Sequence, residues 1–300
     1  MGKSVPESGR AILYFLIGLM ITGWSGNYVA GKIALRTFPP VVLFTLRMPM
    51  AGTLMLLVYW WKRRQGAPPS WTLRDVPQLI RLGVFGVALN QCLFIFGLSR
   101  TSVAHSSIFG NTTPILVLLL ASMRGMERLT SWKIAGVMTA MIGVVLLRLL
   151  DSSGGPEATL AGDLLIFCGA MAFSIFTVFG KPDARRFGPV TLNTFAYVGA
   201  ALLVSPVTLW EAAHYPYRAV PLSAWAAAFY MSAIPSVTCY LIYYYALARM
   251  DASRLAAFAY LQPLLAIVFG SLLLHERVTP WLVVCGVIVF TGVYITERAR

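Results

Sequence analysis

The sequence predicts an all-α integral membrane protein with ten transmembrane helices, arranged as two inverted five-helix repeats. Three observations support this fold class. Of the 300 residues, 58% are hydrophobic and only 12% are charged, a balance that soluble domains rarely show. Apolar stretches of roughly 20 residues, long enough to cross the hydrocarbon core, recur between short polar breaks. The second half of the chain also repeats the first at a constant offset of 149 residues.

The predicted spans follow one another along the chain. They cover residues 11–31, 41–61, 77–98, 102–123, 132–150, 160–180, 188–209, 223–247, 252–274 and 279–296. We expect the first span to be retained, because it continues beyond the core of a signal peptide and lacks a small-residue cleavage pattern. The polar, glycine-rich linker 151–159 separates a first five-helix repeat, 11–150, from a second, inverted repeat, 160–298.

Identical residues occupy equivalent positions in the two halves without any gap. The offset pairs Gly31 with Gly180, Pro40 with Pro189, Pro114 with Pro263, Trp132 with Trp281 and Gly143 with Gly292. Because each half holds an odd number of spans, the second half must enter the membrane from the opposite side. Inverted repeats of this kind are common in carriers that open to either side in turn. We expect identical positions to serve the scaffold and divergent ones to recognise substrate.

The excess of positive charge follows from membrane topology and requires no nucleic-acid partner. The chain has 24 Lys and Arg against 11 Asp and Glu, a net charge of +13. With both termini on one side, 17 basic residues fall on that side and six on the other, while Arg47 lies inside a span. Because cytoplasmic loops retain Lys and Arg, both termini are predicted to be cytoplasmic.

The chain carries no motif for a resident cofactor or for enzymatic chemistry. It has neither a nucleotide-binding glycine loop nor a G-x-S-x-G elbow, and its three histidines and four cysteines are scattered. We therefore expect no enzyme activity, no catalytic residues, no metal site and no cofactor. All four cysteines fall in predicted spans, so no disulfide framework is indicated.

The fourth span combines polar residues with a proline. Ser107, Asn111 and Pro114 are spaced by four and three residues, which places them on one helical face. Pro114 and its repeat partner Pro263 are expected to bend two related helices, in a gating or structural role. Packing alone could explain the prolines, but an unpaired amide in hydrocarbon is costly, so Asn111 favours a polar cavity.

The other candidates for substrate binding are polar and aromatic residues within the spans. Besides Ser107 and Asn111, the set comprises Trp24, Asn27, Tyr28, Asn90, Gln91, Phe94, Phe173, Thr177, Tyr240, Tyr260 and Gln262. Aromatic walls with a few polar anchors suit zwitterionic or neutral ligands that have an apolar part. The run from Tyr243 to Tyr245 lies near a helix end and is assigned to an interfacial belt or to packing.

Arg47 is the charge that lies deepest in the predicted spans. A charged residue at such depth is a candidate for a functional site, here with a gating or structural role. The alternative is that its long side chain reaches the nearby membrane surface or makes a structural pair. Both interpretations fit the sequence.

Several segments resemble an EamA-type member of the drug/metabolite transporter superfamily. They are WSGNYVAGKIAL, FTLRMPMAG, TSVAHSSIFGNTTPILVLL, MERLTSWKIAGVMTAMIGVVLL, GDLLIFCGAMAFS and the run from YYALARMDASRLAAF to FTGVYI. The likeness extends over nearly the whole chain. It implies a ten-helix inverted-repeat carrier in a bacterial inner membrane, usually an exporter of amino acids or other small metabolites. By this resemblance, helices one, three, four, six, eight and nine would line a central cavity.

The leading hypothesis is therefore a secondary exporter or facilitator of amino acids or similar small metabolites that works by alternating access. The expected partners are a small-molecule substrate and the lipid bilayer, and a monomer is compatible with the sequence. Efflux of amphipathic drugs is an alternative within transport. The first helix lacks the glutamate of the smaller multidrug relatives, which argues against proton-coupled efflux of cationic drugs. A membrane sensor or scaffold that transports nothing is the alternative from another class.

Overall fold

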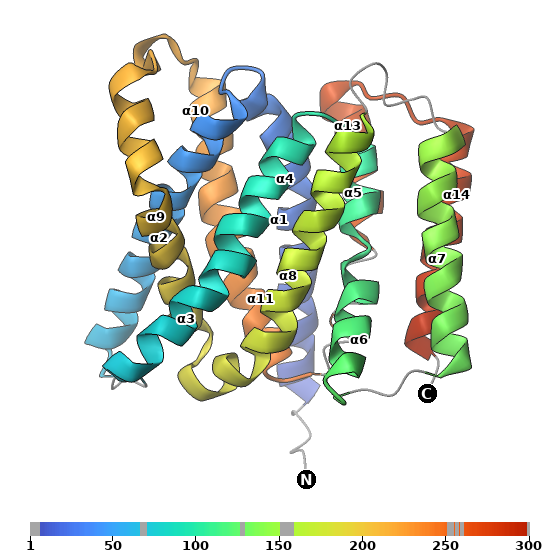
Figure 1. Ribbon diagram of the computed structural model, residues 1–300, viewed down its shortest axis with the longest axis horizontal. Helices are drawn as coiled ribbons and strands as arrows, with labels where there is room; N and C mark the ends of the chain where they lie inside the picture. Colours follow the sequence, from blue (N-terminus) through green and yellow to red (C-terminus); the bar gives the residue numbers. More distant parts are fainter. Residues whose placement is uncertain are drawn as a thin grey trace.

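The computed structural model describes residues 7–66, 71–126, 130–150, 159–250, 255, 258 and 261–298. All regular structure in these ranges is helical (Figure 1). Within them, seven helices are long and apolar enough to cross a membrane: Ala11–Leu35, Pro40–Arg64, Leu73–Leu98, Val103–Met123, Leu160–Phe187, Pro189–His214 and Leu222–Leu247. Shorter apolar helices cover Leu261–Leu274 and Pro280–Gly292.

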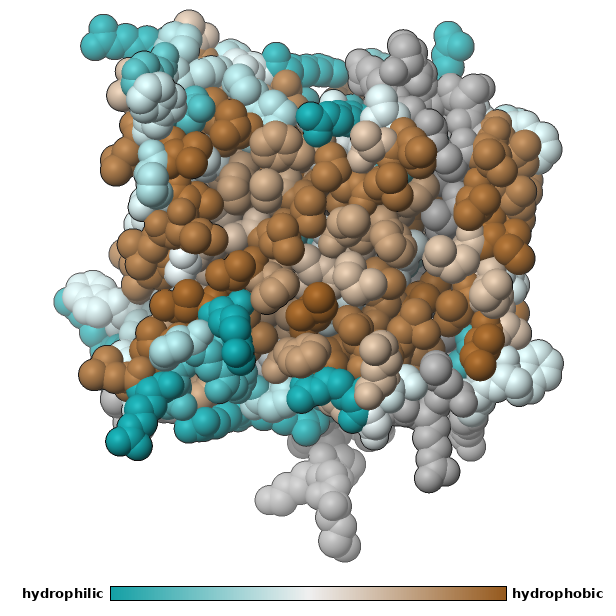
Figure 2. Space-filling view, in the orientation of Figure 1, coloured by the Kyte–Doolittle hydropathy of each residue, from teal (hydrophilic) through white to brown (hydrophobic). Residues whose placement is uncertain are grey.

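Many large hydrophobic side chains are exposed on the outside of the bundle. Figure 2 shows them across the middle of one face, with hydrophilic side chains gathered at its two ends. Phe15, Leu149, Leu202 and Leu272 are between 66% and 73% exposed. An apolar band between polar ends is the surface that a lipid bilayer requires. The chain therefore has the surface and the helices of a multi-pass membrane protein.

The first two long helices pack against helices from the second half of the chain. α1 (Glu7–Leu35) lies against α10 (Leu222–Met231) and α13 (Leu261–Leu274), and α2 (Pro40–Arg64) runs beside α9 (Pro189–His214). Both α2 and α9 begin at a proline, where the missing amide hydrogen costs nothing and the fixed φ suits a helix. The core of the bundle is consequently built from both halves.

The segments predicted as the third and eighth spans are each interrupted by a π-helical segment. In the first, η1 (Leu73–Asp75), a short 3-10 turn, leads into α3 (Val76–Gly83), η2 (Val84–Leu89) and α4 (Asn90–Leu98). In the second, η5 (Ser232–Cys239) lies between α10 and α11 (Tyr240–Leu247), after the short turn η4 (Tyr217–Ala219). The offset of 149 places residues 84–89 on 233–238, so the interruptions are at equivalent positions. π-Helical segments are rare in proteins, and those that do occur are often found at functional sites.

The segment predicted as the fourth span is broken into α5 (Val103–Gly110) and α6 (Thr113–Met123). Pro114 at the start of α6 has no amide hydrogen to donate to the carbonyl of Gly110, four residues earlier. The hydroxyl of Thr113 donates to that carbonyl instead, at 2.7 Å. The break is therefore satisfied within the protein, as a bilayer interior demands.

Apart from these three interruptions, the described helices differ from the predicted spans at two further places. α8 (Leu160–Phe187) continues past the predicted end at residue 180, because the helix extends beyond its apolar stretch into the charged segment 181–186. α8 packs against α4, α5 and α6. The predicted ninth span, 252–274, is described continuously only from Leu261, as α13.

Two helices form a pair at one edge of the bundle. α7 (Ser131–Leu150) and α14 (Pro280–Arg298) pack mainly on each other, as Figure 1 shows. Glycine permits this approach: a Cβ at Gly143 would lie 2.9 Å from the amide nitrogen of Val289, and one at Gly292 would meet the backbone of α7. Gly143 and Gly292 are 149 residues apart, so each half contributes the same glycine to the contact.

We expect Gly292→Ala to separate α7 from α14 and to lower the melting temperature in detergent. The added methyl would meet backbone atoms, which cannot rotate away, and overpacking of this kind costs typically about 1–3 kcal/mol. Gly286→Ala in the same helix is the matched control, because no heavy atom lies within 4 Å of its Cβ position. There, the better helix propensity of alanine should leave the melting temperature unchanged or slightly higher. Equal melting temperatures for the two variants would contradict this packing.

Candidate functional site

A cavity of about 120 Å³ lies inside the bundle, surrounded by helices from both halves of the chain. Most of the predicted site residues line it. They are Trp24, Asn27, Tyr28, Asn90, Gln91, Phe94, Asn111, Phe173, Tyr240 and Gln262, with Arg47 and Pro114. Residues far apart in the sequence therefore converge on one space inside the bundle.

Three predicted residues do not line this cavity, and a fourth lies outside the described residues. Ser107 is buried, and its hydroxyl donates to the carbonyl of Ala104 in its own helix at 2.8 Å. The backbone amide of Asn111, the C-cap of α5, donates to the carbonyl of Ser107 at 3.1 Å, so the helical spacing holds between these two residues. The break lies between Asn111 and Pro114, and both of these line the cavity. Thr177 and Pro263 are buried elsewhere. Tyr260 lies outside the described residues.

The walls of the cavity are aromatic. The ring of Trp24 lies 6.0 Å from those of Phe173 and Tyr240 in edge-to-face geometry, and 5.5 Å from that of Tyr243. Edge-to-face pairs place the positive rim of one ring on the negative face of another, which fixes their orientation. Trp24 and Phe173 are equivalent under the offset of 149, so equivalent positions of the two halves meet at this wall.

The π segments supply carbonyl groups that hold these aromatic residues in place. The indole nitrogen of Trp24 donates to the carbonyl of Pro235 in η5, at 3.2 Å. The hydroxyl of Tyr240 donates to the carbonyl of Gly86 in η2, at 3.0 Å, and lies 3.3 Å from Oδ1 of Asn90. A π segment leaves carbonyls without their usual helical partner, and aromatic donors at the cavity satisfy two of them.

Some polar atoms at the cavity have no hydrogen-bond partner among the described residues. They are Oδ1 of Asn27, both amide atoms of Asn111, and both terminal nitrogens of Arg47. Asn27 and Asn111 are 8% and 3% exposed, and Arg47 is fully buried. Buried polar groups are nearly always paired with protein or with water, so these are the atoms at which a polar ligand or a water molecule would complete the hydrogen bonding.

Arg47 points into the protein rather than to the membrane surface. Its side chain has no exposed area, and its Nε donates to the hydroxyl of Ser236 at 3.1 Å. The alternative that this side chain reaches the surface is therefore wrong. The cause is the packing of α2 against η5, which places Ser236 beside Arg47.

Tyr243, which the sequence assigns to an interfacial belt or to packing, belongs to the site instead. Tyr243 lines the cavity, and its hydroxyl lies 3.2 Å from that of Thr177. A signal was available, because Tyr243 follows Phe94 by 149 residues and Phe94 was a candidate. Small and apolar residues complete the wall without any distinctive sequence signal, including Gly110, Thr113, Val117, Ile166, Gly169, Ala170 and Pro235.

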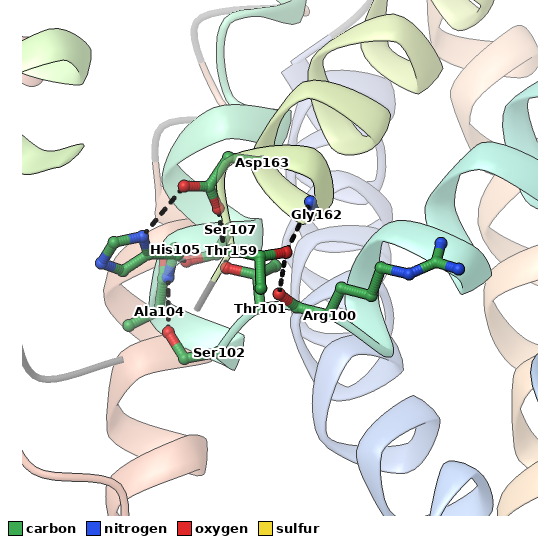
Figure 3. Close-up of polar contacts among 9 residues, drawn as sticks. All are labelled: Arg100, Thr101, Ser102, Ala104, His105, Ser107, Thr159, Gly162 and Asp163. Carbon is green, nitrogen blue, oxygen red and sulfur yellow. Dashed lines mark hydrogen bonds and ion pairs between the residues drawn. The ribbon is translucent and has the colours of Figure 1, made fainter. Parts of the chain in front are cut away.

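A second polar cluster holds the start of α5 against the start of α8 (Figure 3). Asp163 accepts a hydrogen bond from the hydroxyl of Thr101 at 2.7 Å, and its other carboxylate oxygen lies 3.5 Å from Nδ1 of His105. Ser102 caps α5 by accepting from the backbone amide of His105 at 3.1 Å. These residues do not line the cavity, and we assign them to the junction of the two helices.

Comparison with known proteins places the chain among transporters. A sequence model of the EamA-like transporter family matches residues 10–149 and 160–298. An uncharacterized transporter of Archaeoglobus fulgidus is 28% identical, over 96% of this chain and 98% of that protein. The uncharacterized transporter YetK of Bacillus subtilis is 23% identical, over 92% of this chain and 83% of that protein.

Two further similarities bear on function and on fold. A protein of Streptantibioticus cattleyicolor, named a probable terminal-alkyne amino-acid exporter, is 23% identical over 93% of this chain and 91% of that protein. A solved crystal structure superposes with a TM-score of 0.69 at 18% identity and covers 95% of this chain and 96% of that chain. At this identity the superposition shows a common fold.

We expect Tyr240→Phe to destabilise the protein, because the lost hydroxyl connects the two interrupted helices. The carbonyl of Gly86 would remain buried without its donor, at a cost of about 1–3 kcal/mol. The melting temperature in detergent should fall by roughly 2–8 °C. Tyr14→Phe, at a tyrosine that is 52% exposed, is the control and should leave the melting temperature unchanged. An unchanged value for Tyr240→Phe would show that the bridge contributes nothing.

Proposed function

The chain belongs to the EamA-like transporter family, and from this membership we propose that it is a secondary transporter of amino acids or similar small metabolites. In this proposal the substrate binds in the central cavity, which opens to each side of the membrane in turn. The observation that carries the proposal is the cavity itself. It combines aromatic walls with buried polar atoms that lack partners among the described residues, the combination that a small amphipathic metabolite needs.

The arrangement of the helices supports an alternating-access mechanism. Several helix contacts have a counterpart 149 residues along the chain: α1 packs on α10 and α11, and α8 on α3 and α4. The pairs α2 with α9 and α7 with α14 join equivalent helices of the two halves. We propose ten spans in two inverted units, 11–150 and 160–298, joined by the linker 151–159. Rocking of one unit against the other would then expose the cavity alternately.

The distribution of basic residues supports the orientation. We propose that the protein lies in a bacterial inner membrane with both termini in the cytoplasm, since this arrangement leaves most Lys and Arg on the cytoplasmic side. The substrate class draws support from the relative named as a probable amino-acid exporter. Efflux of larger amphipathic compounds is a second candidate, which the aromatic cluster around Trp24 favours.

Transport by reconstituted vesicles tests the proposal. Purified protein in vesicles should exchange labelled amino acids faster than empty vesicles do, and a panel of amphipathic compounds included in the same assay separates the two substrate classes. A pH gradient imposed on the same vesicles reports whether protons are coupled to transport. The proposal fails if no compound of either class crosses faster than in empty vesicles.

We expect Asn111→Ala to weaken substrate binding with little effect on stability. Its side-chain amide makes no hydrogen bond within the described residues, so its loss breaks none there. Loss of one or two hydrogen bonds to substrate should raise the apparent KM roughly two- to tenfold. Asn193→Ala removes another buried asparagine, one that does not line the cavity, and should leave the apparent KM unchanged. An unchanged KM for Asn111→Ala would remove Asn111 from the binding site.

A further inference from the structure

We propose that Arg47 is the receptor for a carboxylate group of the transported compound. This inference rests on the proposed function, because it takes the central cavity as the place where substrate binds. It goes further by assigning one chemical group of the substrate to one side chain. Four features of the described residues carry it.

The first feature is the burial of an uncompensated charge. Arg47 is fully buried within α2, a membrane-length helix, where a charged group loses its hydration. Among the described residues that line the cavity there is no carboxylate, and Arg47 is the one that carries a charge. No ion pair of Arg47 occurs within the described part of the chain. An anionic ligand would supply the missing counter-charge.

The second feature is the way in which Ser236 holds the guanidinium group. The Ser236 hydroxyl donates to the carbonyl of Met231, five residues earlier, at 2.9 Å, a geometry that the π segment η5 provides. Its hydrogen is thereby committed, so its oxygen accepts from Nε of Arg47 at 3.1 Å. This bond fixes one edge of the guanidinium group and orients the rest of it.

The third feature is the geometry of the remaining donors. Both terminal nitrogens of Arg47 are buried and have no hydrogen-bond partner among the described residues. A guanidinium group presents such nitrogens as a planar fork, which matches the two oxygens of a carboxylate. A phosphate dianion fits less well, because the described lining residues offer a single positive charge. The site therefore suits one carboxylate.

The fourth feature is the pair of hydrogen-bond acceptors and the aromatic wall that the rest of the cavity presents to the same ligand. Oδ1 of Asn27 and Oδ1 of Asn111 are acceptors without partners in the described part of the chain, and they can receive hydrogen bonds from an ammonium or amide group. The rings of Trp24 and Phe173 provide an apolar wall and a π-face for a cation. The complete ligand is a monocarboxylate with an apolar body and a hydrogen-bond donor, which is the chemistry of a free amino acid.

The carboxylate receptor exists in one half of the chain only. The offset of 149 places Arg47 on Ala196 and Val87 on Ser236, so neither partner of this hydrogen bond is repeated. A site that departs from the repeat can bind an asymmetric substrate in a single orientation. The receptor is thus a specific addition to the scaffold.

Thermal stabilisation of the purified full chain in detergent tests this inference with small probe compounds. The probes are L-phenylalanine and 3-phenylpropanoate, which carry a carboxylate, and L-phenylalaninamide, which carries the same body without one. We expect both acids to raise the melting temperature in a saturable manner, and the amide to have no effect. Sodium chloride and inorganic phosphate, as further arms, should not reproduce the effect of the acids.

Three arginine variants in α2 assign the effect to a residue. Arg47→Gln keeps a polar side chain but loses the charge, and it should raise the apparent Kd of L-phenylalanine roughly tenfold to a hundredfold. Arg64→Gln removes the same charge from an exposed position of α2 and should leave that Kd unchanged. Arg47→Lys keeps the charge without the fork and should fall between Arg47→Gln and the native protein.

The outcomes separate this inference from the proposed function. Equal stabilisation by the acid and its amide, stabilisation by neither acid, an equal effect of chloride or phosphate, or unchanged acid binding by Arg47→Gln each overturns the carboxylate receptor. If Arg47→Gln fails to fold, the comparison of acid with amide on the native protein still decides. If acids bind through Arg47 but no compound crosses vesicle membranes, the receptor stands and the transport proposal fails.

Discussion

Every backbone amide and carbonyl within a bilayer must find its partner inside the protein, because lipid offers no hydrogen bonds. Regular helices meet this requirement automatically, but a cavity requires helices that bend or open. The structure combines the two demands by giving released carbonyls a side-chain donor. Thr113 donates to the carbonyl of Gly110, which Pro114 cannot reach with an amide hydrogen. Tyr240 donates to the carbonyl of Gly86 in η2, and Trp24 donates to that of Pro235 in η5. All three donors line the cavity, so the residues that stabilise the interrupted helices also shape the site.

The lipid environment also penalises a buried charge that has no counter-charge, and Arg47 is such a group among the described residues. A buried guanidinium group without a carboxylate lowers stability, and a protein retains such a group where function needs it. Ser236 accepts from Nε, and the two buried terminal nitrogens have no partner among the described residues, which differs from a structural arginine whose donors are all paired. Asp163 differs from Arg47, because its carboxylate accepts a hydrogen bond from Thr101 and lies beside His105 at a helix junction. Asp163 is paired at the junction of α5 and α8, whereas Arg47 lines the cavity.

Periodicity and composition predicted the helices well and the cavity in large part. Apolar length alone located the long helices, and polar or aromatic residues inside spans identified most of the lining. The errors have physical causes. Ser107 lies one helical turn before Asn111, but its hydroxyl donates to the carbonyl of Ala104 in its own helix, and the residue does not line the cavity. The direction of Arg47 depended on Ser236, a residue 189 positions away whose placement is set by tertiary packing. No local pattern encodes such a contact.

The two π segments also carry information about ancestry. A π turn arises naturally when one residue is inserted into an established helix, because the bulge absorbs the extra residue while the flanking turns keep their packing. Here the bulges occur at equivalent positions of two halves that align without a gap. Separate insertions in each half would have to match by coincidence. The simpler history is that a single ancestral half already contained the insertion, and that gene duplication then copied the irregularity together with the helices around it.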